Sequence, residues 1–237
     1  NKKAAALDLD NTLWGGVIGD DTADGIEIGH ETASAEAFYE FQSYIREQSQ
    51  LGVLLTICSK NDEENALEGL NHPEGALKPA DFVSIKANWE SKDQNIAQSA
   101  QELGILPESF VFIDDNPAER EIVSAQLGAA APDIGLPEEY IRNIDRNGFF
   151  EVTQLSKDDI SRNDMYKANI RRKESEAKYA SYHDYLLSLE MTAEIEPFLP
   201  VYIQRITQLT NKSNQFNLTT KRYTQNEIEE IANNPEY

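Results

Sequence analysis

Four short apolar runs alternate with longer amphipathic stretches between residues 4 and 127, and this order constrains the fold more than any other feature. Strands that are apolar on both faces and alternate with helices are typical of a parallel sheet covered on both sides. The sequence therefore predicts an α/β fold with a Rossmann-like parallel sheet. The runs are AAALDL, VLLTIC, FVSI and FVFI, and the helix-like stretches are 35–48, 63–70, 93–103 and 118–127.

The rest of the chain has a different pattern. We expect a core domain over 1–148 and a mostly helical C-terminal extension over 149–237. The stretch 156–189 contains neither glycine nor proline, which favours helix. After it, we predict a strand over 191–198 and a helix over 200–209.

Composition excludes several classes of protein. The 42 acidic and 21 basic residues give a net charge of -21, whereas nucleic-acid backbones are bound by basic surfaces. The single cysteine, Cys58, rules out an intrachain disulfide and fits a reducing compartment. The sequence has no apolar run of about 18 residues, the length that a membrane-spanning helix needs. We therefore expect a cytoplasmic protein that binds neither nucleic acid nor a membrane.

Polar residues stand at the ends of the predicted strands. In a parallel sheet, ligands bind in a crevice beyond the carboxyl ends of the strands. The polar side chains at these ends should therefore converge on one site. They are Asp8, Asp10, Ser59, Lys86, Asp114 and Asp115.

Asp8 and Asp10 follow the first apolar run, in the sequence LDLDNT. A carboxylate can attack phosphorus and form an aspartyl phosphate, which splits one difficult transfer into two easier steps. The reaction also needs a cation against charge repulsion and an acid that protonates the leaving oxygen. A D-x-D pair alone is more often a helix cap or a solvated turn than a catalytic pair. The residues at the other strand ends must therefore decide between these possibilities.

Asp114 and Asp115 follow the fourth apolar run. Two adjacent acids at the end of a buried strand are costly unless a cation is bound or solvent reaches them. Together with Asp8 and water molecules, they can complete an all-oxygen octahedral site. Such a site suits Mg²⁺ better than a softer metal.

Two further segments offer groups for a phosphate. Ser59, Lys60 and Asn61 lead into a helix, where a hydroxyl and the helix start can bind an anion. The alternative is that Ser59, Asn61 or Asp62 only caps this helix. Lys92 stands at another helix start, and its ammonium can hold the nucleophile and the phosphate together. A plain surface lysine is the alternative, and Lys86 is the second candidate for this role.

The order of these features along the chain resembles that of the four motifs of the haloacid dehalogenase superfamily. They are DLDNT, a hydroxyl, a lysine and DD. The resemblance implies that Asp8 is the nucleophile and a Mg²⁺ ligand. It implies that Asp10 is the general acid and base, and that its backbone carbonyl binds the metal. It adds Asn11 and Thr12 to the phosphate-binding residues. The second aspartate points to the phosphatase and phosphotransferase branches, and DKTGT, the mark of the ion pumps, is absent.

A closer resemblance rests on LDLDNTLWGGVIGDD, CSKND, NWESKDQNI, FIDDNPAER and RITQLTNKSNQFNLTTKRY. Over nearly the whole chain, these segments are similar to the FkbH-like family, a capless subclass (IIIC) of the superfamily. Members of known role load a glyceryl unit from 1,3-bisphosphoglycerate onto an acyl carrier protein and remove phosphate on the way. Longer members carry an acyltransferase-like domain after the segment where this sequence ends.

The intervals between these motifs are too short for a full cap domain, so other segments must limit the access of water. The glycine-bearing flap over 15–29 and the helical second part are candidates. Trp14 is a candidate lid residue, although core packing is the alternative. Further candidates for contact with a substrate or another domain are Asn116, Asn211, Lys212 and Asn214.

These residues favour a Mg²⁺-dependent phosphatase or phosphotransferase that acts on a small phosphorylated metabolite through an aspartyl phosphate. One alternative is part of an FkbH-like glyceryl-loading enzyme. Acyl transfer in that family would be expected to pass through a cysteine, and Cys58 stands at the end of a buried strand. The other alternative is a non-catalytic interaction scaffold, and the presence of both Asp8 and Asp10 speaks against it.

Overall fold

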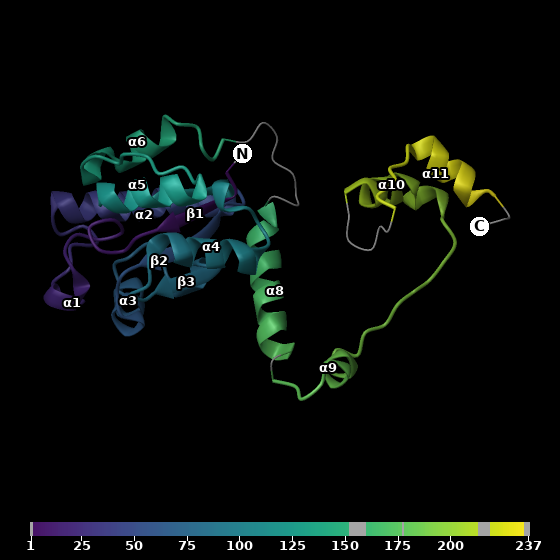
Figure 1. Ribbon diagram of the computed structural model, residues 1–237, viewed down its shortest axis with the longest axis horizontal. Helices are drawn as coiled ribbons and strands as arrows, with labels where there is room; N and C mark the ends of the chain where they lie inside the picture. The colour runs from purple at the N-terminus through teal and green to yellow at the C-terminus, as the bar shows by residue number, and fades with distance from the viewer. Residues whose placement is uncertain (1, 152–159, 177, 213–218, 235–237) are drawn as a thin grey trace. The chain divides into compact units, whose positions relative to one another are not determined.

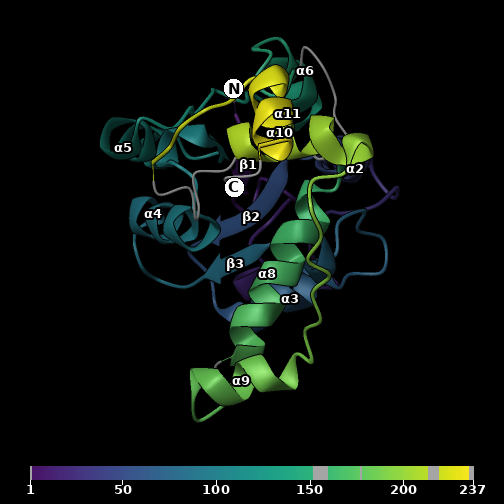
Figure 2. The same ribbon diagram turned by 90° about the vertical axis from the view of Figure 1, so that its right-hand side faces the viewer.

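The computed structural model describes residues 2–151, 160–176, 178–212 and 219–234. Within these residues, four parallel strands form one sheet in the order β3-β2-β1-β4. Figure 1 labels β1, β2 and β3 of this sheet among the surrounding helices. Figure 2 shows the arrowheads of β2 and β3 side by side and pointing the same way. The predicted parallel sheet is thus confirmed. The strands are β1 (Ala4–Leu7), β2 (Leu54–Ser59), β3 (Ser84–Ala87) and β4 (Phe110–Ile113).

Helices alternate with these strands where the sequence predicts them. The N-cap Thr32 accepts a hydrogen bond from the Ala35 amide at the start of the first long helix. Gly104 and Gly128 end two later helices in the left-handed conformation, which suits glycine. The four helices are α2 (Ala33–Gln50), α3 (Glu63–Leu70), α4 (Lys92–Leu103) and α5 (Pro117–Leu127). Short elements that the sequence did not predict are α1 (Ile18–Asp21), α6 (Tyr140–Asp145), η1 (Pro79–Asp81), η2 (Pro107–Ser109) and η3 (Pro137–Glu139).

Both faces of the sheet are covered, because successive residues of a strand point to opposite sides. Leu7 and Ile57 belong to an apolar cluster with residues of α2, α3 and α6. Ala6 and Cys58 belong to a second cluster with residues of α4 and α5. The strands therefore carry apolar side chains on both faces, and the predicted layered α/β fold is confirmed.

The helix α8 (Arg162–Glu176) lies beyond the predicted core boundary at residue 148 and packs on the core. The side-chain amide of Asn163 donates to the Ser49 and Val53 carbonyls, at 2.6 and 3.1 Å. Tyr166 and Ile170 contact the second apolar cluster. The chain divides into two compact units, 1–178 and 179–237, so α8 belongs to the first.

The second unit contains α9 (Tyr182–Ser188), η4 (Pro200–Tyr202), α10 (Ile203–Lys212) and α11 (Gln225–Ala232). The helix predicted over 200–209 is confirmed, with Pro200 at its start. The strand predicted over 191–198 is wrong, because this exposed segment pairs with no strand among the described residues. The helical stretch predicted up to Leu189 is interrupted, because Ser181 adopts an extended conformation and caps α9 instead.

Among the helices that the structure describes, none combines the length and the apolar character needed to cross a bilayer.

Candidate active site

The ends of β1 and β4 bring the acidic residues together. These strands pair in parallel with Leu7 opposite Ile113, and the Asp8 amide donates to the Ile113 carbonyl at 3.0 Å. The residue after each strand is an aspartate, Asp8 in one case and Asp114 in the other. Strand register therefore places the two carboxylates at the same edge of the sheet.

Asp8, Asp114 and Asp115 form an acidic cluster, in which one carboxylate oxygen of each lies within 4.8 Å of the others. Asp8 and Asp114 are buried, and Asp115 is exposed. Within the described part of the chain, the buried Oδ1 of Asp8 has no hydrogen-bond partner. A buried oxygen without a partner is costly unless a ligand binds it, and three carboxylate oxygens suit a hard divalent cation. The cluster therefore has the donor set of a metal site.

Lys92 lies between two of these acids. Its Nζ is 2.9 Å from Asp8 Oδ2 and 2.6 Å from Asp114 Oδ2, and all three side chains are buried. Burial lowers the pKa of Lys92, but the two carboxylates outweigh this effect and hold its pKa above the ordinary value. Burial, followed by the charge of Asp8, raises the pKa of Asp114 to about 6. Lys92 therefore stays charged and partly neutralises the acidic cluster.

Asp10 is held in place by three hydrogen bonds. Its Oδ1 accepts from the Trp14 indole at 2.9 Å and from the Ile18 amide at 3.0 Å. Its Oδ2 accepts from the Asn61 side chain at 2.9 Å. Burial raises the pKa of Asp10, although the hydrogen bonds from Ile18 and Trp14 oppose this effect. A raised pKa and a fixed orientation suit a carboxyl group that donates and accepts protons.

The chain reaches Asp10 through a tight turn after β1. The Thr12 and Leu13 amides both donate to the Leu9 carbonyl, and Asn11 has a φ of 53° in the left-handed region. Trp14 is fully buried in the apolar core, which favours the core-packing alternative over the lid role. Its indole nitrogen orients Asp10 instead.

The three residues at and after the end of β2 that were predicted to bind phosphate have different surroundings and partners. Ser59 is buried at the end of β2. Asn61 donates to Asp10, and its oxygen accepts from the Asp62 amide. Lys60 pairs with Glu119 of α5 at 2.5 Å. These contacts make Asn61 a partner of Asp10 and tie Lys60 to α5, and the phosphate-binding role of Ser59 stays a prediction.

Three more predicted residues make local structural contacts. The hydroxyl of Thr12 accepts from the Asp115 amide at 3.2 Å. The side-chain oxygen of Asn11 accepts from the Gly16 amide at 3.0 Å. Asn116 caps α5 through its side chain, and its backbone amide donates to Asp114 Oδ1 at 2.8 Å. These residues shape the turns that hold the acids.

The two candidate lysines differ in their partners. Lys86 lies on β3, and its Nζ is 2.7 Å from Glu102 of α4. Lys92, by contrast, contacts Asp8 and Asp114 directly. The geometry therefore favours Lys92 for the role of holding nucleophile and phosphate together.

We expect Lys92→Met to weaken the binding of inorganic phosphate at least about tenfold, because one charge-assisted hydrogen bond is lost. Lys86→Met should bind phosphate like the wild type and serves as the matched control. Isothermal titration calorimetry in the presence of Mg²⁺ measures both affinities. Loss of binding in Lys86→Met with normal binding in Lys92→Met would contradict the assignment.

Two residues near the acids had not been predicted. Arg120 donates to the Asp114 and Asp115 carbonyls, at 2.9 and 2.7 Å. The Tyr140 hydroxyl donates to the Asn11 carbonyl at 2.8 Å. Arg120 belongs to the motif FIDDNPAER, but nothing in that motif separates it from a solvated arginine. Tyr140 lies far from Asn11 in the sequence and follows no recognisable signal.

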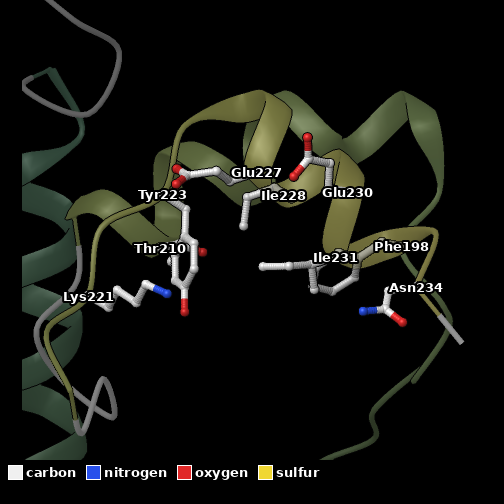
Figure 3. Close-up of a pocket in the computed structure, with 9 residues that line it drawn as sticks. All are labelled: Phe198, Thr210, Lys221, Tyr223, Glu227, Ile228, Glu230, Ile231 and Asn234. Atoms are coloured by element: carbon white, nitrogen blue, oxygen red, sulfur yellow. The ribbon is translucent and has the colours of Figure 1, made fainter. Parts of the chain in front are cut away.

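The remaining predicted residues belong to the second unit. Asn211 makes two hydrogen bonds with the backbone of Tyr223, at 2.7 and 3.0 Å, and so holds the chain before α11. The Lys212 side chain and Asn214 lie outside the described residues. A cavity of about 540 Å³ lies in this unit, and Figure 3 shows Phe198, Ile228 and Ile231 along it. Of the predicted site residues that the structure describes, none lines this cavity.

The chain is similar to a solved structure that contains a phosphatase domain. That structure is the N-terminal part of the protein BF1531 from Bacteroides fragilis, in complex with Mg. The two chains are 39% identical and superpose with a TM-score of 0.63, over 65% of this chain and 42% of that one. This chain therefore spans less than half the length of that chain. Comparison with protein-family models and with curated proteins gave no match.

Proposed function

We propose that this chain is a Mg²⁺-dependent phosphatase or phosphotransferase domain of the haloacid dehalogenase type, with Asp8 as nucleophile. The proposal rests on the partners of the two carboxylate oxygens of Asp8. One of its oxygens is paired with Lys92, and the other is buried without a partner among the described residues. The similarity to a phosphatase domain solved in complex with Mg supports the same function.

The acidic cluster provides the ligands for the metal. Asp8, Asp114 and Asp115 would hold Mg²⁺ through carboxylate oxygens, and the backbone carbonyl of Asp10 is a further proposed ligand. When bound, the ion neutralises the repulsion between the carboxylate of Asp8 and the phosphoryl oxygens. The all-oxygen donor set fits this ion.

The chain's own residues would carry the two chemical steps. In the first, an Asp8 oxygen attacks phosphorus, the bond to the leaving oxygen breaks, and the proton of the Asp10 carboxyl moves to that oxygen. In the second, Asp10 takes a proton from water, which attacks phosphorus and breaks the bond to Asp8. Free phosphate leaves, and both carboxyl groups return to their first states. Lys92 and the Ser59 hydroxyl would bind the phosphoryl oxygens in both steps.

The FkbH-like resemblance implies glyceryl loading, and we expect that reaction to pass through a reactive cysteine. The single thiol of this chain, that of Cys58, does not suit this role. Cys58 is only 2% exposed, and its Sγ donates to the Lys92 carbonyl at 3.4 Å. Burial raises the pKa of Cys58, which disfavours the reactive thiolate. The phosphoryl step is therefore the one that these residues support. An acyl carrier protein and an acyltransferase-like domain remain proposed partners.

Phosphate release from a panel of phosphorylated metabolites tests the proposal. We expect release with Mg²⁺, and a loss of at least about 100-fold after chelation, since a bound metal contributes several kcal/mol to transition-state stabilisation. Adding Mg²⁺ back should restore the rate. The panel should include acetyl phosphate, 3-phosphoglycerate and sugar phosphates. Failure to release phosphate from any of them, or release that chelation leaves unchanged, would overturn the function.

A further inference from the structure

Trp89 is the most exposed large apolar side chain among the described residues of the first unit, at 72% exposure. Tryptophan usually buries most of its surface, and an exposed aromatic ring commonly marks a contact with a partner or ligand. The chain has a second tryptophan, Trp14, which is fully buried. The exposure of Trp89 therefore calls for a functional explanation.

The loop that carries Trp89 lies at the candidate active site. It begins at Asn88, whose amide donates to the Ser59 carbonyl at 3.1 Å, beyond the ends of β2 and β3. It ends at Lys92, whose ammonium contacts Asp8 and Asp114. The ring of Trp89 is thus presented between the Ser59 segment and the start of α4, on the edge of the sheet where the acids lie.

One hydrogen bond fixes the orientation of this ring. The Trp89 indole nitrogen donates to Asp62 Oδ1 at 2.9 Å. Asp62 directly follows Asn61, which donates to Asp10. The Asp62 backbone amide donates to the Asn61 side-chain oxygen at 2.9 Å, so the segment Asn61–Asp62 links the ring of Trp89 to the proposed general acid. A ring fixed at its nitrogen can offer a face to a ligand without losing side-chain freedom on binding.

The chemistry of this surface favours a sugar ring. The faces of an indole are electron-rich, and a carboxylate on its N–H group makes them more so. They attract C–H groups polarised by neighbouring hydroxyls and repel a phosphate. Asp62 and Glu90 are exposed, and their carboxylates can accept hydrogen bonds from sugar hydroxyls.

We propose that Trp89 and Asp62 form the subsite for the leaving group, and that this group is a sugar ring. The substrates would then be sugar phosphates. This inference rests on the proposed phosphatase function. The phosphoryl end of such a substrate meets Lys92 and Asp8, and its ring lies on Trp89.

Kinetics on three substrates separate the contributions of the subsite. Acetyl phosphate has no ring and serves as the reference substrate. Trp89→Ala should lower kcat/KM for glucose 6-phosphate, relative to that for acetyl phosphate, about tenfold, because its KM for glucose 6-phosphate rises. Trp89→Phe should retain most of the specificity because it keeps a ring. Asp62→Asn should lower the value for glucose 6-phosphate and spare phenyl phosphate, which stacks but has no hydroxyls. Equal losses for acetyl phosphate and glucose 6-phosphate in Trp89→Ala would overturn the subsite.

Two controls support these comparisons. Leu106→Ala removes another exposed apolar side chain, 63% exposed, before the amino end of β4 and therefore at the opposite edge of the sheet. It should leave all three substrates unchanged. Asp62→Asn should not disturb α3, because in the described structure the Asp62 side chain makes no capping hydrogen bond.

Fluorescence tests binding without turnover. In Asp8→Asn with Mg²⁺, acrylamide should quench exposed Trp89 and spare buried Trp14. Saturating glucose 6-phosphate should at least halve the quenching constant of Trp89, whereas inorganic phosphate should leave it unchanged. Trp89→Phe, with Trp14 alone, serves as the blank. Unchanged quenching when calorimetry shows glucose 6-phosphate to be bound would overturn the subsite.

Failure of the subsite and failure of the proposed function give different results. If glucose 6-phosphate shields Trp89 but no substrate releases phosphate, the phosphatase function is wrong and the sugar subsite stands. If phosphate is released with the same specificity by Trp89→Ala and the wild type, the subsite is wrong and the phosphatase function stands.

Discussion

Asp8→Asn should reduce phosphate release to the background rate on every substrate. The substitution removes the attacking anion and one charged ligand of the proposed Mg²⁺ site, so no phosphoenzyme can form. The fold should persist, because Lys92 keeps its contact with Asp114 at 2.6 Å. Turnover, mass spectrometry of acid-quenched protein and thermal unfolding together measure these effects.

A matched control strengthens this test. Asp164→Asn makes the same chemical change at an exposed position on α8, and should keep full activity. Wild-type protein quenched during turnover should carry phosphate on Asp8, and Asp8→Asn should carry none. Wild-type turnover by Asp8→Asn would rule out the aspartyl-phosphate mechanism.

Asp10→Asn should slow the release of phosphate from an alkyl phosphate by about 10²- to 10⁴-fold, the usual contribution of a general acid. The nucleophile and the acidic cluster remain, but the proton donor is lost. The effect should be much smaller on acetyl phosphate, whose leaving group needs little protonation. Steady-state rates on the two substrates give the comparison.

Asn61→Ala provides the control for orientation. It removes the partner of Asp10 Oδ2 but leaves the carboxyl group and its contacts with Trp14 and Ile18. Its effect should therefore be milder than that of Asp10→Asn. If Asp10→Asn slows both substrates equally, Asp10 acts by positioning the metal rather than by donating a proton.

The strands and helices of the core could be predicted because they depend on local patterns. The strands β1, β2 and β4 are largely apolar and fully buried, and helices of the core begin or end at residues suited to that position, such as Thr32 or Gly104. The segment 191–198 was predicted wrongly for a physical reason. A strand is stabilised by a neighbour, and this exposed segment has none among the described residues.

Roles within the site were less predictable than its members. In the sequence, Lys86 and Lys92 both come shortly after the third apolar run, so both were candidates for the phosphate-binding lysine. Only the packing of α4 shows which of them contacts the acids. That packing pairs Lys86 with Glu102 and brings Lys92 to Asp8. Trp14 likewise could belong to a lid or to the core until its burial was known.

The sequence by itself determined the residue types at the carboxyl edge of the sheet, because the end of an apolar run marks the end of a buried strand. It thereby indicated Asp8, Asp10 and Asp114 as candidates for one site. Tertiary structure alone decided which groups contact them, such as the Tyr140 hydroxyl on the Asn11 carbonyl, and which side chains stay exposed, such as Trp89. Contacts between distant residues depend on the packing of whole helices and strands, and no local pattern encodes that packing.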